Sequence, residues 1–330
     1  MDQPIKVAFL GATGESGGLI LSGLLASENP KFEVTALARP SSISKPAYEK
    51  LSSRGVPTVA VDLQGPEAEI AEYLKVFDVV IASVPPNALE SQLPLARAAK
   101  LTNVKRFVPS AFAMAIDPDG VSSAQKMKEQ IYAEISALGL PFTIIDVGWW
   151  YNGFIPQVPS GKTSYAVALP DFLQNLIPGD GTIKTHVVDP DNVGTFVARI
   201  LADPRTLNKR VMASSAIMSF NDMFDVVEEL AGERPQRKYI SADGLRDMIS
   251  DLSTKIELDP GNYMLLVGKV WLEYYASSFI DGDNSPRGVS GLGYLLATEL
   301  YPDVQTTSFT RFFTDVLGKK RRVPYSDRVA

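Results

Sequence analysis

Cysteine is absent from this 330-residue sequence, and histidine occurs once, as His186. Without cysteine the chain forms no disulfide, offers no thiolate to a metal and has no cysteine nucleophile. A single histidine leaves a zinc site without its usual ligands, so we expect no metal. The G-x-S-x-G elbow of serine hydrolases is also missing, which leaves serine hydrolysis without support.

Long apolar runs and basic clusters are missing too. No uninterrupted apolar run approaches the roughly 18 residues of a membrane span, and the opening MDQPIKVAFLG lacks the features of a signal peptide. The net charge of −6 argues against a nucleic-acid surface, and we interpret GKKRR (318–322) as a solvated tail. We therefore expect a cytoplasmic monomer or homodimer that binds a small molecule, and neither a nucleic acid nor a membrane.

Short apolar segments that alternate with helical patterns fill the first half of the chain. Such runs are typical of parallel strands covered on both faces. They predict an α/β fold, a Rossmann-like doubly wound sheet. The expected strands are 5–10, 33–38, 57–62, 78–84, 105–110 and 142–148, with helices near 17–27, 67–75, 88–100 and 121–138.

The pattern changes after Gly148, which suggests a second, interleaved region. We predict that residues 1–148 form the dinucleotide-binding domain, with parts of 182–218 returning to its sheet. Residues 149–181 and 219–330 then form a smaller, mostly helical substrate region at the C-terminal side.

A glycine-rich turn follows the first strand directly. In VAFLGATGESGG the glycines are Gly11, Gly14 and Gly17, a GxxGxxG variant of the dinucleotide fingerprint in its strand–turn–helix context. The alternative is a glycine turn without a ligand. As further cofactor contacts we predict Thr13 in this turn, together with Ser83 and Val84 at the end of the fourth strand.

The end of the second strand indicates which dinucleotide binds. An NAD site has an acidic residue there for the ribose hydroxyl, whereas this chain has Arg39, with Lys45 six residues later. Cations at this place pair with a 2′-phosphate, which favours NADP(H). The alternative is that Arg39 and Lys45 are ordinary surface cations.

Lys128 is the candidate catalytic residue. None of the twelve tyrosines has a lysine four residues later, so the Tyr-x-x-x-Lys pair of short-chain dehydrogenases is missing. Lys128 shares a helix face with Ile131, Tyr132 and Ile135, at the edge of an apolar stripe, whereas Lys126 lies on the polar side. A desolvated ammonium is a better proton donor near neutrality, but a snorkelling lysine gives the same spacing. His186 is more often structural than catalytic in such a setting.

Several segments resemble NmrA-like and isoflavone-reductase-like proteins, which are atypical short-chain dehydrogenases that include phenylcoumaran benzylic ether reductases. The resemblance runs the length of the chain, through GATGESG, ALARP, VKRFVPSAF, GLPFT, PGDGTIK, DNVGTFVARILADPRTLNK and ELYPDVQTTSF. It implies a lysine with a catalytic or cofactor-orienting role eleven residues before the glycine of GLPFT, which is Lys128, so Lys128 is also a predicted cofactor contact. It also implies an NADPH-dependent reductase of a small aromatic or polyketide-like metabolite.

Two segments depart from the family pattern where a substrate would lie. PSAFA (109–113) stands for the usual PSEFG, and VGWWYNGF (147–154) replaces an asparagine-centred segment, so the plant substrates do not transfer. These segments look more like fungal members of secondary metabolism. Trp149, Trp150, Tyr151 and Phe154 follow the sixth strand and are the candidate substrate contacts. The alternative function is a non-catalytic, dinucleotide-binding regulator of the NmrA type that acts through a protein partner.

Overall fold

The computed structural model describes residues 3–102 and 104–326. Its main feature is a parallel sheet in which five strands run in the order β3-β2-β1-β4-β5. A parallel bridge between Phe107 and Phe142 leads on to three further parallel strands, in the order β6-β10-β13. The bounds are β1 Ile5–Leu10, β2 Phe32–Ala38, β3 Thr58–Ala60, β4 Val79–Ala82, β5 Arg106–Val108, β6 Thr143–Asp146, β10 Lys209–Met212 and β13 Leu295–Leu296.

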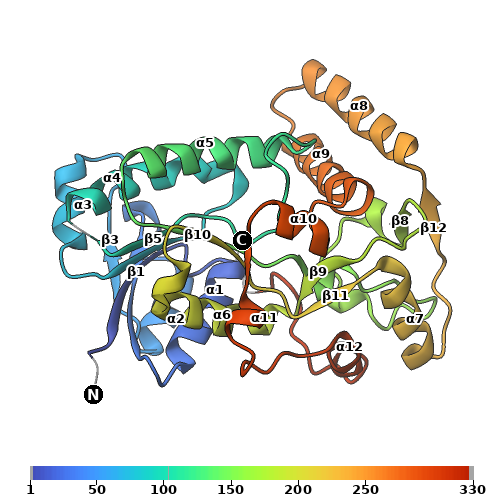
Figure 1. Cartoon of the computed structure of the whole chain (residues 1–330), viewed down its shortest axis with the longest axis horizontal. Coiled ribbons are helices and arrows are strands. Elements are labelled where there is room, and N and C mark those ends of the chain that lie inside the picture. The colour runs from blue at the N-terminus through green and yellow to red at the C-terminus, as the bar shows by residue number, and fades with distance from the viewer. Residues whose placement is uncertain (1–2, 103, 327–330) are drawn as a thin grey trace.

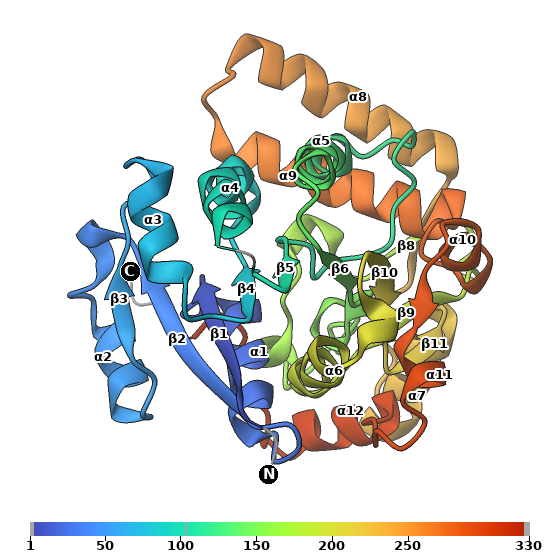
Figure 2. The same ribbon diagram turned by 60° about the vertical axis from the view of Figure 1, so that its left-hand side comes forward.

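Helices cover both faces of this sheet (Figure 2). Along β1, Val7 and Phe9 pack in one core with α1, α2 and α6, whereas Ala8 and Leu10 pack in another with α3, α4 and α5. This alternation explains why the strands are apolar at nearly every position. The predicted doubly wound α/β fold is confirmed. The helix bounds are α1 Glu15–Ala26, α2 Pro46–Ser53, α3 Glu67–Leu74, α4 Leu93–Leu101, α5 Ser123–Ala137 and α6 Pro190–Ala202.

A second group of elements packs beside the sheet, to the right in Figure 1. Its core is rich in aromatic side chains and holds two small sheets, β11-β9-β7 and β12-β8. The strand bounds are β7 Trp149–Trp150, β8 Leu176–Pro178, β9 Thr185–Val188, β11 Ala216–Met218 and β12 Lys238–Ile240. The helix bounds are α7 Phe220–Ala231, α8 Ala242–Leu258, α9 Tyr263–Ala276, α10 Pro286–Gly291, α11 Ala297–Leu300 and α12 Phe309–Leu317.

The chain between 182 and 218 divides its strands between the two parts. β10 pairs with β6 in the main sheet, whereas β9 pairs with β7 and β11 in the small one. The division of the chain at residue 148 stays a prediction, and its outer limits, 1 and 330, lie outside the described residues.

Candidate functional site

The glycine-rich turn after β1 leaves the first amides of α1 without a side-chain cap. Gly11 has φ +89°, and a Cβ there would lie 2.0 Å from the carbonyl oxygen of Ser83. A Cβ on Gly17 would lie 2.0 Å from the carbonyl oxygen of Gly11, so helix and turn are in close contact. Gly14, the N-cap residue, is exposed and brings no capping side chain, and Thr13 beside it is half-buried. Uncapped amides at a helix start suit an anionic group, so the turn fits a dinucleotide phosphate.

The ends of β4 and β5 border the same turn. The Ser83 amide donates to the Leu10 carbonyl over 2.9 Å. The Ser110 hydroxyl accepts from the Val84 amide at 3.1 Å and donates to the Val84 carbonyl at 2.9 Å. Ser83 and Val84 therefore lie at the carboxyl edge of the sheet beside Gly11, held there by backbone contacts.

Arg39 and Lys45 lie in the connection from β2 to α2 and are both exposed. Across residues 3–102 and 104–326, neither side chain forms a hydrogen bond or an ion pair. The two cations are therefore available for a phosphate next to the glycine turn. Their role in binding stays a prediction.

Lys128 is buried in the middle of α5, with 6 % of its surface exposed, whereas Lys126 is exposed. The Ser122 hydroxyl caps this helix by accepting from the Gln125 amide at 3.2 Å. One turn after Lys128, the Tyr132 hydroxyl donates to the Ser110 carbonyl at 3.3 Å, which places this face of α5 at the carboxyl end of β5. The lysine thus faces inward, although Met127, which the periodicity also assigns to the apolar stripe, is 43 % exposed.

The Lys128 ammonium shares its buried surroundings with the Asp146 carboxylate at the end of β6. Burial lowers the pKa of Lys128, while the charges of Asp146 and Glu129 oppose that shift. Burial likewise raises the pKa of Asp146, with Lys128 opposing it. Among the described residues no hydrogen bond or ion pair occupies the ammonium of Lys128. Lys128 is therefore a candidate for proton transfer, and its catalytic role stays a prediction.

Asp146 itself is held from two directions. The Tyr294 hydroxyl donates to its Oδ2 at 2.6 Å, and the Ala113 amide donates to its Oδ1 at 3.4 Å. The turn that supplies Ala113 contains Phe112 at φ +49°, an unusual conformation for a side chain of this size. Asp146 was not among the predicted site residues, although an acid at the end of the apolar run FTIID was a signal. Tyr294 gave no local signal.

Aromatic side chains lie close to this charged group. Trp149 packs against Trp271 and Tyr274 of α9, with ring centroids 5.8 and 6.4 Å apart. Trp271 and Tyr274 are half-buried. Burial and the nearby Asp146 carboxylate raise the pKa of Tyr274. The aromatic cluster therefore lies close to Asp146.

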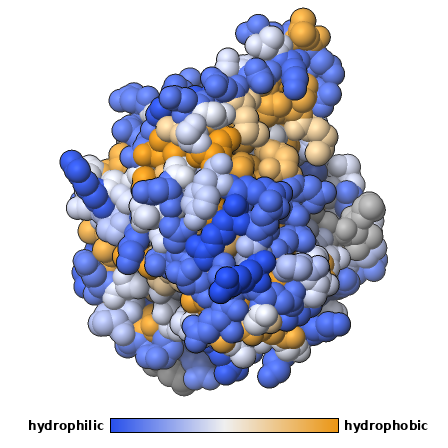
Figure 3. Space-filling model, turned by 90° about the vertical axis from the view of Figure 1, so that its right-hand side faces the viewer, coloured by the Kyte–Doolittle hydropathy of each residue, from blue (hydrophilic) through white to orange (hydrophobic). Residues whose placement is uncertain are grey.

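The contact between α5, which carries Lys128, and α9, which carries Trp271 and Tyr274, holds the two helices together. The Glu273 carboxylate accepts from the Ser123 amide at 2.9 Å and from its hydroxyl at 2.7 Å. Figure 3 shows apolar side chains gathered on the upper part of the face that carries α8 and α9. The surface over these two helices is therefore partly apolar.

The predicted substrate residues do not stay together. Trp149 and Phe154 are buried in one aromatic cluster, with ring centroids 5.4 Å apart. Tyr151 is fully buried against α12 and donates to the Thr307 carbonyl at 3.0 Å. Trp150 is half-buried against the core of the main sheet. Of the four, Trp149 contacts the half-buried rings of α9, and Phe154 packs behind it.

His186 is buried away from solvent in β9. Its Nδ1 lies 2.7 Å from the Ser214 hydroxyl, and burial lowers its pKa to about 4. The ring is therefore neutral at pH 7 and is a poor source of a proton. Within the described chain its Nε2 is buried without a hydrogen-bond partner.

The described residues offer neither a metal-binding cluster nor a membrane-spanning helix. No three Asp, Glu, His or Cys side chains among them are grouped so as to hold a metal ion. None of the helices in the described ranges is both long and apolar enough to cross a bilayer.

The family follows from comparison with known proteins. The model of the NmrA-like family matches residues 3–309. The chain belongs to the NmrA-like family. The predicted resemblance is thus confirmed.

Relatives and solved structures extend over nearly the whole chain. Asnovolin J 5′,6′-dehydrogenase nvfM from Aspergillus novofumigatus is 39% identical and covers 95% of each chain. Phenylcoumaran benzylic ether reductase TP7 from Nicotiana tabacum is 30% identical over 93% of this chain and 97% of its own. The NADPH complex of leucoanthocyanidin reductase from Vitis vinifera superposes with a TM-score of 0.77 at 23% identity, over 95% of this chain and 99% of its own, which shows the shared fold.

Proposed function

We propose that this NmrA-like protein is an NADP(H)-dependent oxidoreductase of a small aromatic or polyketide-like metabolite. The observation that carries the proposal is the buried Lys128 ammonium, which faces Asp146 at the carboxyl edge of the sheet and has no described partner. Ligands bind at this edge in open α/β sheets. The relatives named a dehydrogenase and a benzylic ether reductase support the same class of chemistry.

The cofactor half of the proposal depends on the turn after β1 and on the connection after β2. The uncapped start of α1 takes the pyrophosphate, and Arg39 with Lys45 takes the 2′-phosphate. When bound, the nicotinamide supplies or accepts a hydride. The NADPH and NADP⁺ complexes among proteins of the same fold are consistent with this cofactor.

Lys128 handles the proton that accompanies the hydride. Hydride addition to an unsaturated or carbonyl carbon leaves negative charge on the substrate, and the ammonium stabilises that charge or donates a proton to it. The lysine is then a neutral amine, the form that its burial favours. In the oxidative direction the neutral amine accepts the proton. The Asp146 carboxylate compensates the charge of the lysine while it is protonated.

The half-buried rings of Trp271 and Tyr274, backed by Trp149 and Phe154, form the proposed contact surface for the substrate. Flat apolar rings next to a charged pair suit a planar, conjugated ligand with one polar end. A cytoplasmic location and a monomeric or homodimeric state also stay predictions.

The test compares Lys128→Ala with Lys126→Ala. NADPH oxidation is followed by absorbance, with metabolite extracts and conjugated aromatic ketones as substrates. Lys128→Ala should lower turnover by about 10²–10⁴, the usual scale for a general acid, and should still bind NADPH. Lys126→Ala, which changes an exposed lysine two residues away, should match the wild type.

Two outcomes contradict the assignment. Equal turnover of the two variants, or full turnover by Lys128→Met, would mean that the lysine is only packed in the core. Tight NADPH binding without turnover of any substrate would favour the non-catalytic regulator instead.

A further inference from the structure

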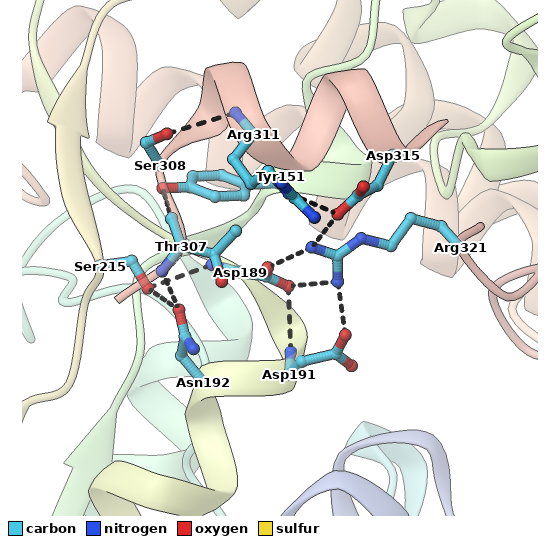
Figure 4. Close-up of polar contacts among 10 residues, drawn as sticks. All are labelled: Tyr151, Asp189, Asp191, Asn192, Ser215, Thr307, Ser308, Arg311, Asp315 and Arg321. Carbon is cyan, nitrogen blue, oxygen red and sulfur yellow. Dashed lines mark hydrogen bonds and ion pairs between the residues drawn. The ribbon is translucent and has the colours of Figure 1, made fainter. Parts of the chain in front are cut away.

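The chain after α12 returns to the start of α1, and Arg321 anchors it. Arg321 has only 14 % of its side chain exposed and donates to both oxygens of Asp189, at 3.2 and 2.7 Å (Figure 4). Asp189 is fully buried at the N-cap of α6, and the guanidinium lies 4.6 Å from the centre of the Phe312 ring. Arg321 also pairs with Asp191. The interpretation of GKKRR as a solvated tail is therefore wrong at Arg321, because a buried carboxylate binds it.

The next residues reach the glycine turn. Arg322 forms an ion pair with Glu15, and the Tyr325 amide donates to the same carboxylate at 3.2 Å. Glu15 is the first residue of α1, directly after Gly14, and only 7 % of its side chain is exposed. Residues 320–325, named here the C-terminal segment, thus cover a carboxylate that belongs to the predicted phosphate loop.

Arg322 lies between two hollows of the surface. One, of about 580 Å³, also touches Thr13 and Gly14 of the turn. The other, of about 240 Å³, is bordered by Asp189 and Arg321. A group bound at the turn therefore has the Arg322 guanidinium within its surroundings.

Charge gives this contact a consequence for cofactor binding. A carboxylate at the start of a helix is favourable while the amides have no other anion. Dinucleotide phosphates bring further negative charge to the same amides, so an unpaired Glu15 would repel them. Arg322 neutralises that carboxylate, and Arg321 fixes Arg322 in place through Asp189.

We propose that the C-terminal segment completes the dinucleotide site, with Arg322 as a positioning residue that neutralises Glu15 and so raises affinity for the phosphates of NADP(H). This inference rests on the dinucleotide binding in the proposed function. The ligand class is a nucleotide pyrophosphate, and the contribution of Arg322 acts through Glu15.

The test is a double-mutant cycle on NADPH affinity in the full chain, measured by calorimetric titration. Arg322→Ala should weaken binding about tenfold, because Glu15 is left unpaired beside the phosphates. Glu15→Gln should tighten binding, and the double variant should bind close to the wild type. A purely structural role for Arg322 would give no such rescue. The control is Lys319→Asn, which removes an equal charge from an exposed, left-handed position just before the segment.

Three results overturn the inference. Unchanged NADPH affinity in Arg322→Ala would show that the segment does not serve the site. A double variant as weak as Arg322→Ala would show that Glu15 is not the group through which Arg322 acts. A wild-type protein that binds no NADPH would refute both this inference and the proposed cofactor. The cycle does not test the catalytic role of Lys128, which the turnover assay of Lys128→Ala tests separately.

Discussion

Two glycines set the distance between α1 and α6, and an alanine at one of them should be costly. A Cβ on Gly194 would lie 2.3 Å from the Leu19 carbonyl oxygen and 2.8 Å from the Gly23 Cα. A Cβ on Gly23 would lie 2.1 Å from the Gly194 carbonyl carbon. These distances are about 1 Å or more short of van der Waals contact, and backbone stands on both sides. The helices must therefore move apart to accept Gly194→Ala.

The expected cost is about 2–4 kcal/mol of unfolding free energy. Overpacking typically costs about 1–3 kcal/mol, and a backbone neighbour yields less than a side chain would. In a chain of this size that corresponds to a fall in Tm of about 3–6 °C. Because α1 begins at the glycine turn, the same displacement should also weaken NADPH binding.

Gly18→Ala in the same helix α1 is the matched comparison. A Cβ there meets nothing within 4 Å, so alanine should stabilise the helix by about 0.5–1 kcal/mol. Thermal and urea unfolding of the two variants without cofactor measures both effects. Wild-type stability in Gly194→Ala would refute the view that the two glycines fix the helix spacing.

Two further predictions concern the proposed site. Arg39→Ala should reduce the preference for NADPH over NADH about ten- to hundredfold, because the variant lacks a charge-assisted contact to the 2′-phosphate. Titration with both cofactors measures this preference, and an unchanged preference would contradict the assignment of Arg39. Turnover in the reductive direction should fall as pH rises through the pKa of Lys128, which burial holds below its usual value, because only the protonated lysine donates. Asp146→Asn removes a charge that raises the pKa of Lys128, so the falling limb of the pH–rate profile should move to lower pH. A limb that stays in place would contradict the electrostatic interaction between Asp146 and Lys128.

Much of the fold was predictable because it depends on local patterns. The expected strand 5–10 coincides with β1, and the glycine spacing marks the turn and the start of α1. The position of Lys128 beside Ile131 and Ile135 followed from helix periodicity, because neighbours three and four apart share a face. The same spacing left open whether its ammonium reaches solvent, and the fold decides that by burying it.

Contacts between distant segments were not predictable in this way. Asp146 and Tyr294 are 148 residues apart and meet only through the strand order of the sheet. Trp149, Trp150 and Tyr151 all follow β6, but only Trp150 packs against the core of the main sheet, whereas the other two lie in the aromatic core. Arg322 and Glu15 are 307 residues apart, so the sequence gives no sign that they form an ion pair. Without that contact, a basic run such as GKKRR is typical of a solvated segment.

The buried pair of Lys128 and Asp146 has a property that suits both directions of a hydride transfer. Burial opposes the charged form of each group, whereas their mutual attraction favours the charged forms together. A lysine balanced in this way loses a proton more readily than a solvated one and still regains it beside the carboxylate. The relatives of this chain include one named a dehydrogenase and one named a reductase, and under the proposed function such a lysine would serve either reaction. If Lys128 is the proton donor, we expect the cofactor ratio and the substrate to decide the direction of the reaction.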